Sequence, residues 1–548
     1  MKRWLVFSLC CQPILWTYAE ETMECPPSAQ NESLEVSKLP IKVQQLEIIT
    51  HPIFDESDPD TIWLHRFANW LHINTKPEVI EERLPFTTGQ TVSSTELAEA
   101  ERIVRKLPYV RDARVRAVAS CQADNPITVE VESWDNWSLI PTISFGRKGG
   151  KNKGSIGIKE DNLLGLGIRT RFKYNSDDQR TGYQFTMESA TPYLMAYSTV
   201  LLDYLDNDDG NLVNVEFNRP FYHAKTDNMY FGSYLTDDHI LDIYQNGGTR
   251  NSFASQSHRY EIATGWQVDS TLLHSQRIKV GIVDEEALFL PDPFKPSDPE
   301  LVPLDRRYQY AWLGFESLQR DFRILSDIYL IDQAEDINLG LHYEVKLGLD
   351  IASNNDSQGL GYHLDAQINN GWQLNGGLLL VSAKAQGTFN QAYDDHYSLS
   401  MEGEYFKRYN RLFAMYGRLS AATELNPLLD SPLTVGDDSG VRGYPLQYQH
   451  GERSVSGSLE ARLYTGYNLY KILDVGFAAF VDAGRAWGGD EGLLNETDKV
   501  LGSVGLGTRL YSSRASHRNV IHLDIVKPMI SSENVDTWQW RLQVKESF

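Results

Sequence analysis

The sequence predicts a mainly β fold: a large antiparallel transmembrane β-barrel that follows one small α+β domain. From about residue 138 onward, runs of about ten residues alternate apolar and polar side chains, then break at Asp, Asn, Gly or Ser. The runs continue to the end of the chain, which exceeds what one soluble β-sandwich contains. Aromatic residues are 11% of the chain, and many lie near the ends of these runs. This placement is typical of the interfacial girdles of membrane barrels.

Each predicted strand has one apolar face and one polar or small face, because successive side chains of a strand point to opposite sides. In residues 454–467, for example, Leu459 and Leu463 alternate with Glu460. Short turns alternate with long loops between the runs, which is the outer-membrane pattern. At roughly 25 residues per strand and loop, we expect about sixteen strands in residues 136–548.

The last run closes this pattern at the C-terminus. Its polar positions are Gln539, Arg541, Gln543 and Lys545. Its apolar positions, with the terminal aromatic residue, are Trp538, Trp540, Leu542, Val544 and Phe548. We predict that this run is the closing strand of the barrel.

The N-terminus predicts export. A basic start, an apolar stretch and a small residue before Glu20 indicate a cleaved secretory signal at residues 1–19, and residues 20–37 form a leader. Cys25 and Cys121 are then the two cysteines of the mature chain. In an oxidising compartment they could form one structural disulfide, and the alternative is two unrelated thiols.

Composition excludes several classes of function. The chain has 51 basic and 74 acidic residues, and its net charge of −23 argues against nucleic acid as a partner. The sequence contains no G-x-S-x-G elbow, no H-E-x-x-H helix and no phosphate-binding glycine loop. We therefore expect no enzymatic activity, no cofactor and no metal site.

Residues 38–135 predict a separate small domain. Strands are expected at 41–49, 109–119 and 126–133, and two stretches between them have helical spacing. The second of these stretches opens with Ser93-Ser94-Thr95-Glu96, a capping-box pattern. A small sheet of this kind can bind an extended peptide at its edge, and the alternative is a spacer or barrel plug.

The stretch "GDDSGVRGYP" at 436–445 carries an arginine that needs an explanation. A loop around 430–452 could project into solvent or fold into the barrel. Inside a lumen an unpaired Arg442 would be costly, so it would require an inward-facing carboxylate. The alternation of the following strands offers Glu460 and Asp482.

The motif "VRGYP" at 441–445, followed by "FVDAG" at 480–484, resembles the BamA/TamA superfamily of POTRA-domain outer-membrane barrels, the bacterial surface antigen family. The resemblance implies a lumenal loop motif of Val441, Arg442, Gly443 and Tyr444. It also implies a wall motif of Phe480, Asp482 and Gly484. Arg442 would then engage Asp482, with Glu460 as a second partner.

Two further segments extend the resemblance. Residues 74–115 resemble a single POTRA domain, and the closing strand that ends in Phe548 resembles the barrel-assembly signal of the family. The implied location is the Gram-negative outer membrane, with the POTRA domain in the periplasm. Outer-membrane lipid, unfolded or β-rich client proteins and periplasmic or lipoprotein accessory factors are the implied partners.

Three functions follow as expectations. The first is an assembly and translocation factor that inserts or exports β-rich clients through the POTRA domain and a weak barrel seam. The alternative is a dedicated transporter of the two-partner type. The third is a porin-like or structural barrel, against which an inward loop argues because it would block the pore.

Overall fold

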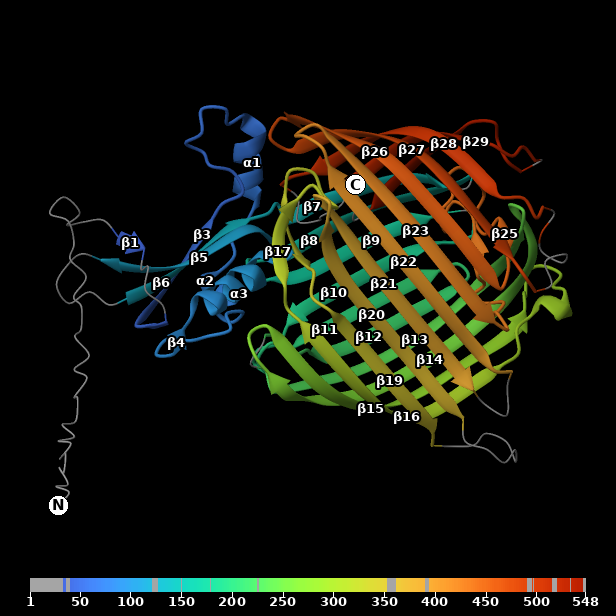
Figure 1. Ribbon diagram of the computed structural model, residues 1–548, viewed down its shortest axis with the longest axis horizontal. Helices are drawn as coiled ribbons and strands as arrows, with labels where there is room; N and C mark the ends of the chain where they lie inside the picture. Colours follow the sequence, from blue (N-terminus) through green and yellow to red (C-terminus); the bar gives the residue numbers. More distant parts are fainter. Residues whose placement is uncertain are drawn as a thin grey trace, which may run out of the picture.

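The structure is a computed structural model with a small N-terminal α+β domain at one end of a large barrel (Figure 1). It describes residues 33–35, 40–120, 127–148, 150–177, 179–223, 226–351, 361–389, 394–489, 495, 497–514, 520–532 and 534–545. Cys25, Cys121 and Phe548 lie outside these residues. No helix in the described part of the chain is long and apolar enough to cross a membrane.

The N-terminal domain contains a four-stranded sheet in the order β1-β5-β6-β3, in which β3 lies parallel to β6. Its elements are β1 (Ser33–Glu35), β2 (Ile41–Lys42), β3 (Gln45–His51), α1 (Trp63–Leu71), α2 (Pro77–Glu81), β4 (Thr91–Val92), α3 (Ser94–Arg105), β5 (Val110–Ser120) and β6 (Ile127–Asp135). Ile80 of α2 and Val104 of α3 share a core with Val129 and Val131 of β6. Both predicted helices are present as α1 and α3, whereas α2 was not predicted from periodicity.

The capping box of α3 is confirmed. The backbone N–H of Ser93 donates to Oε2 of Glu96 at 2.8 Å, and the backbone N–H of Glu96 donates to Oγ of Ser93 at 3.4 Å. These reciprocal bonds satisfy two donors that the first turn of a helix leaves free.

The barrel is closed, and its described residues form twenty antiparallel strands. They are β7 (Leu139–Lys148), β8 (Lys151–Leu163), β9 (Ile168–Ser176), β10 (Thr181–Ala190), β11 (Thr199–Asn207), β12 (Gly210–Arg219), β13 (Asn228–Gln245), β14 (Gly248–Ser270), β15 (His274–Pro291), β16 (Arg306–Gln319), β19 (His342–Asp350), β20 (Tyr362–Leu374), β21 (Gly377–Phe389), β22 (His396–Arg408), β23 (Phe413–Leu425), β26 (Arg453–Leu469), β27 (Leu473–Trp487), β28 (Leu501–Ser512), β29 (Val520–Pro528) and β30 (Gln539–Lys545). A 3₁₀-helix, η1 (Pro299–Leu301), lies in the connection from β15 to β16.

The expected number of about sixteen strands is therefore wrong. Several hairpins have connections of two residues, such as 208–209, 246–247 and 375–376. The strands consequently follow one another more closely than the assumed spacing, so more of them fit into the same length of chain.

The predicted division of the strands into two faces is confirmed. Along β27 every second residue from Asp474 to Gly484 is buried, and the residues between them are more exposed. On β26, Leu459 and Leu463 are exposed while Glu460 is buried. The outer face of the barrel is thus apolar, and the polar side chains point into the lumen.

The ring closes between the last strand and the first at a weak seam. β30 and β7 align at a single residue pair, Leu542 with Arg147. By contrast, β29 pairs with β30 over residues 520–526, and β7 pairs with β8 over residues 139–148. The described seam therefore has much less backbone pairing than the joints on either side of it.

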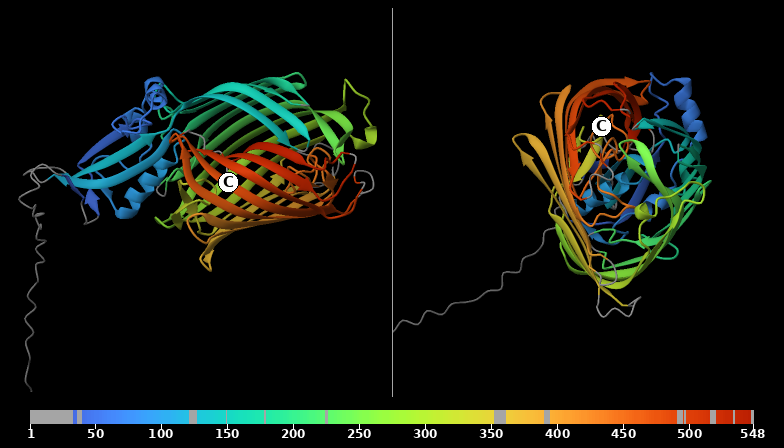
Figure 2. Two further views of the ribbon diagram at one scale, coloured as in Figure 1. Left: turned by 90° about the horizontal axis from the view of Figure 1, so that it is seen from above. Right: turned by 90° about the vertical axis from the view of Figure 1, so that its right-hand side faces the viewer.

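Two segments outside the wall fold into the lumen from opposite ends, and the view down the barrel shows chain inside the ring of strands (Figure 2). The inward loop, residues 426–452, enters from the end far from the N-terminal domain and carries β24 (Thr434–Val435) and β25 (Gln449–His450). The inward hairpin, residues 320–341, enters from the domain's end and carries β17 (Phe322–Ser326) and β18 (Ala334–Asn338). The sequence predicts the inward loop but gave no indication of the inward hairpin.

Candidate functional site: a latch inside the barrel

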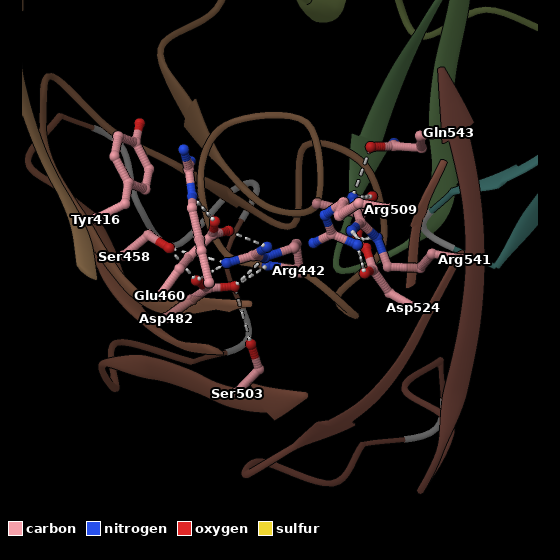
Figure 3. A network of polar contacts seen from close by, with 12 residues as sticks. Tyr416, Arg442, Ser458, Glu460, Asp482, Ser503, Arg509, Asp524, Arg541 and Gln543 are labelled. Atoms are coloured by element: carbon pink, nitrogen blue, oxygen red, sulfur yellow. Dashed lines mark hydrogen bonds and ion pairs between the residues drawn. The ribbon is translucent and has the colours of Figure 1, made fainter. Parts of the chain in front are cut away.

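Arg442 lies in the inward loop with only 7% of its surface exposed, and its guanidinium points at the barrel wall (Figure 3). Its Nε and Nη2 donate to the two carboxylate oxygens of Asp482 at 2.7 and 2.6 Å. Its Nη1 donates to Oε1 of Glu460 at 2.7 Å, and Nη2 also donates to Oγ of Ser458 at 2.8 Å. The bidentate geometry makes the pair with Asp482 the strongest of these contacts.

The wall residue Phe480 completes the arginine site. The guanidinium carbon of Arg442 lies 3.4 Å from the centroid of the Phe480 ring, which is a cation–π contact. Gly505 on the neighbouring strand makes room for this ring, because a Cβ there would lie 2.3 Å from Cζ of Phe480. Arg442 is thus held by charge on one side and by an aromatic face on the other.

Glu460 connects the inward loop to the inward hairpin. Its second carboxylate oxygen accepts a hydrogen bond from Nε of Arg462 at 3.1 Å. Arg462 in turn donates from Nη1 to the backbone carbonyl of Ile328, in the hairpin, at 3.0 Å. Two adjacent inward positions on β26 therefore hold both segments that occupy the lumen.

The remaining residues of the predicted loop motif hold the tip of the loop against the barrel wall. Val441 and Tyr444 are fully buried in a small apolar cluster. The hydroxyl of Tyr444 donates to the carbonyl of Gly502 at 2.8 Å. Gly443 has φ +89°, a conformation that favours glycine. A Cβ on Gly484 would lie 2.8 Å from Val441, so this wall glycine gives the loop its space.

A second group of ion pairs attaches the same loop to the last strand, and the sequence did not predict it. Nε of Arg541, on β30, lies 2.7 Å from Oδ1 of Asp437 in the loop. Arg541 also donates from Nη1 to Asp524 at 2.9 Å, and Arg509 donates to the other oxygen of Asp524 at 2.6 Å. Alternation places the three wall residues on inward faces, but it cannot show that they meet Asp437.

The ion pairs of this site join equal numbers of positive and negative side chains. Four arginines, at 442, 462, 509 and 541, face four carboxylates, at 437, 460, 482 and 524 (Figure 3). Burial of each charge alone would be costly, so the pairing explains why all eight can lie in a confined lumen. The arrangement holds the inward loop against the wall, and we call it the latch.

The inward hairpin has its own contacts, and they reach the N-terminal domain. Nη1 of Arg105, in α3, donates to Oδ2 of Asp336 in the hairpin at 3.0 Å. The guanidinium of Arg102 lies 4.3 Å from the centroid of the Phe322 ring. At the wall side, the hydroxyl of Tyr329 donates to Glu404 at 2.7 Å. The hairpin therefore lies between the domain and the wall.

The predicted closing-strand residues lie elsewhere. Trp540 and Val544 are exposed on the outer face of β30, and Trp538 is exposed just before that strand. Leu542 lies on the same strand, at the seam. These side chains do not enter the latch.

No protein-family model matches the chain, and no curated protein matches its sequence. Solved structures are similar to it. CdiB from Acinetobacter baumannii is 12% identical with a TM-score of 0.45, and the match covers 92% of this chain and 74% of that one. BamA from Haemophilus ducreyi lacking POTRA domains 1-3 is 11% identical with a TM-score of 0.38, covering 91% and 83%. CdiB from Escherichia coli is 10% identical with a TM-score of 0.38, covering 94% of both chains.

Proposed function

We propose that the protein is an outer-membrane polypeptide transporter that exports a dedicated, β-rich secreted partner through its lumen. The observation that supports this proposal most directly is what occupies the lumen. A barrel of this strand number encloses a space wide enough for a channel or a plug. Here the space is occupied by two segments of the chain that are not part of the wall and are held there by side-chain contacts. Such segments can leave without breaking the barrel.

The outer-membrane location rests on the two faces of the wall. Apolar side chains such as Leu459 and Ile525 point outward, and charged ones such as Asp524 point inward. A lipid-embedded barrel has this distribution, whereas a soluble barrel has the reverse.

The N-terminal domain would be a periplasmic POTRA domain that receives the partner. Its sheet ends in the edge strand β3 on one side and in the three-residue strand β1 on the other. An extended client segment can add to such an edge through backbone hydrogen bonds. The domain also contacts the inward hairpin through Arg105 and Asp336, so a client bound there is next to the lumenal segment it must displace.

A second candidate function is assembly of other outer-membrane barrels, and the seam is the observation that favours it. One aligned pair between β30 and β7 leaves backbone donors and acceptors that a client strand could use. In this case clients would leave sideways into the membrane and not through the lumen.

Quantitative proteomics of a deletion strain and its parent tests the proposal. We expect one secreted protein to disappear from the medium while outer-membrane barrels remain at their parental levels. A joint decrease of several outer-membrane barrels would reject dedicated export and favour assembly. No change in either fraction would reject both functions.

A reversible cross-link at the seam separates the two routes. Leu542→Cys with Arg147→Cys would join the one aligned pair of β30 and β7. The matched control is Leu506→Cys with Ile525→Cys, an aligned outward pair of β28 and β29. We expect export to continue with either disulfide formed. If the seam disulfide alone abolishes activity and a reductant restores it, the client leaves through the seam and not through the lumen.

A further inference from the structure

The helix α1 exposes an aromatic stripe that the fold of its own domain does not use. Trp63, Phe67 and Trp70 follow one another at helical spacing, and their exposed fractions are 74, 44 and 77%. The opposite face is buried, where His65 and Ala68 pack with Phe54. Large aromatic side chains exposed side by side mark a contact surface.

The position of α1 indicates what covers this stripe. The helix lies outside the ring of strands at the domain's end of the barrel, and it runs across the barrel axis (Figures 1 and 2). Nε2 of His65 lies 2.9 Å from the carbonyl oxygen of Tyr470, in the turn between β26 and β27. The segment after the helix is held by the turn between β8 and β9, where the N–H of Lys76 donates to the carbonyl of Gly165 at 3.0 Å. The helix is thus fixed at the rim of the barrel, between these two turns.

The apolar outer face of the barrel continues into the stripe. Beside the C-terminal end of α1, the exposed residues Ile73, Leu164 and Leu166 connect it to the outward side chains of β8. At the other end of the helix, Tyr467 and Tyr470 are exposed on the turn that holds His65. Exposed apolar side chains therefore reach α1 past the turn between β8 and β9, whereas at the turn between β26 and β27 Lys471 also forms ion pairs with Asp58 and Asp60.

Residue chemistry favours lipid over a protein partner. Trp and Tyr are the residues enriched at the interface between hydrocarbon and headgroups. The chain has a net charge of −23, yet α1 contains no Asp or Glu and exposes Arg66 beside the stripe. An arginine next to aromatic residues suits a phosphate-bearing surface.

We propose that α1 is an interfacial helix that lies in the periplasmic leaflet of the outer membrane, with Trp63, Phe67 and Trp70 inserted among the phospholipids beside the barrel seam. The proposal rests on the outer-membrane location proposed above. It adds a membrane contact made by the N-terminal domain itself, independent of which client the barrel handles.

Quenching by brominated phosphatidylcholine tests the insertion with the full-length mature protein in vesicles. The parent and the variant Trp63→Phe with Trp70→Phe are measured side by side, and the difference between their emissions is the fluorescence of Trp63 and Trp70. This difference is recorded with the quencher and without it. Trp→Phe keeps the stripe apolar, so the variant should fold. The lipid control is Trp266→Phe, an outward residue of β14 near the same end of the barrel, and the lumenal control is Trp312→Phe, a buried residue of β16.

We expect the emission of Trp63 and Trp70 to be lost to the quencher to an extent comparable with that of Trp266, while the emission of Trp312 is retained. Quenching of Trp266 alone would overturn the inference and leave the membrane barrel intact. Quenching of neither would overturn the membrane location as well. Blue-shifted but unquenched emission of Trp63 and Trp70 would show a protein partner or a second copy on the stripe, and would also overturn the inference.

Discussion

Arg442 is buried with its partners already in position, so removing the arginine leaves charges behind. Without the guanidinium, Asp482 would keep three hydrogen-bond donors that carry no net charge, the backbone N–H at position 442 and the hydroxyls of Ser458 and Ser503. Glu460 would keep its contact with Arg462. Removing one member of a buried ion pair destabilises the fold by more than the intact pair stabilises it, because the remaining charge stays uncompensated in a low-dielectric space.

We therefore expect Arg442→Ala to lower the free energy of unfolding by about 3–5 kcal/mol. Arg442→Lys should be intermediate, since an ammonium keeps the charge but loses the bidentate contact. Urea unfolding in vesicles, followed by electrophoretic mobility of the folded barrel, measures both. Asp438→Asn, at an exposed position of the same loop, is the control and should unfold like the parent. An Arg442→Ala variant as stable as this control would contradict the latch.

His450 gives the inward loop a dependence on pH. Burial lowers the pKa of this histidine, whose backbone is held by Asn495 through two hydrogen bonds of 2.8 and 2.7 Å. The unfolded chain takes up a proton near pH 6.5 and the folded loop only at lower pH, so stability falls as the pH drops below about 6.5.

We expect the free energy of unfolding of the parent to be lower at about pH 5.5 than at about pH 7.5, two values on either side of the ordinary histidine pKa of about 6.5. His450→Gln should reduce this loss, because glutamine does not titrate. His396→Gln, at the same end of the barrel, should leave it in place. Equal pH profiles for the parent and His450→Gln would show that this histidine does not set the dependence.

At the scale of the elements, the lumen is closed twice. The inward loop and the inward hairpin reach it from opposite ends, and Glu460 and Arg462 hold both to β26. Removing one segment should leave the other in place, because each has contacts of its own.

Conductance in planar bilayers tests this double closure. We expect a low conductance for Arg442→Ala alone and for a variant in which a short Gly-Ser turn replaces residues 322–338. The hairpin replacement combined with Arg442→Ala and Arg541→Ala, which remove both groups of ion pairs that hold the inward loop, should give a large, steady conductance, since a barrel of this size is wide when empty. A parent with large steady conductance would contradict closure and favour a porin, whereas a closed combined variant would show that other parts fill the lumen.

What the sequence predicts at this scale depends on how local the signal is. The alternation along 475–484 is set by each strand itself, so the inward side of Asp482 could be predicted. The inward hairpin has two strands of five residues, too short for a recognisable pattern. The pair of Asp437 and Arg541 depends on where the loop lands on the closed ring, 104 residues apart in sequence. No local rule specifies that meeting.

At the scale of the whole molecule, a buried polar cluster joins the domain to the barrel. Asp135 is fully buried and accepts hydrogen bonds from the N–H of Thr75 at 2.7 Å and from Nε2 of His72 at 2.9 Å. Nδ2 of Asn162, at the end of β8, donates to Oγ1 of Thr75 at 2.8 Å. The cluster thus spans the last strand of the domain, the segment after α1 and the barrel.

Asp135→Ala should release the domain from the barrel mouth, because it leaves buried donors without an acceptor at a cost of about 1–3 kcal/mol. Hydrogen exchange measures this: we expect faster exchange at residues 72–76 and 162–167, with the strands of the wall unchanged. Glu78→Ala, at an exposed position of α2, should exchange like the parent. Unchanged exchange in Asp135→Ala would mean that other contacts suffice for docking.

The domain also contacts the barrel on both sides of the seam, and these contacts lie at the domain's end of the barrel. On one flank His65 and Asp58 hold Tyr470 and Lys471, and on the other Thr75 holds Asn162. While these contacts hold, the distance along the rim between the two turns cannot increase. Any parting of β30 from β7 would then open as a wedge, with its hinge at the end of the barrel that bears the domain and its wide side at the opposite end.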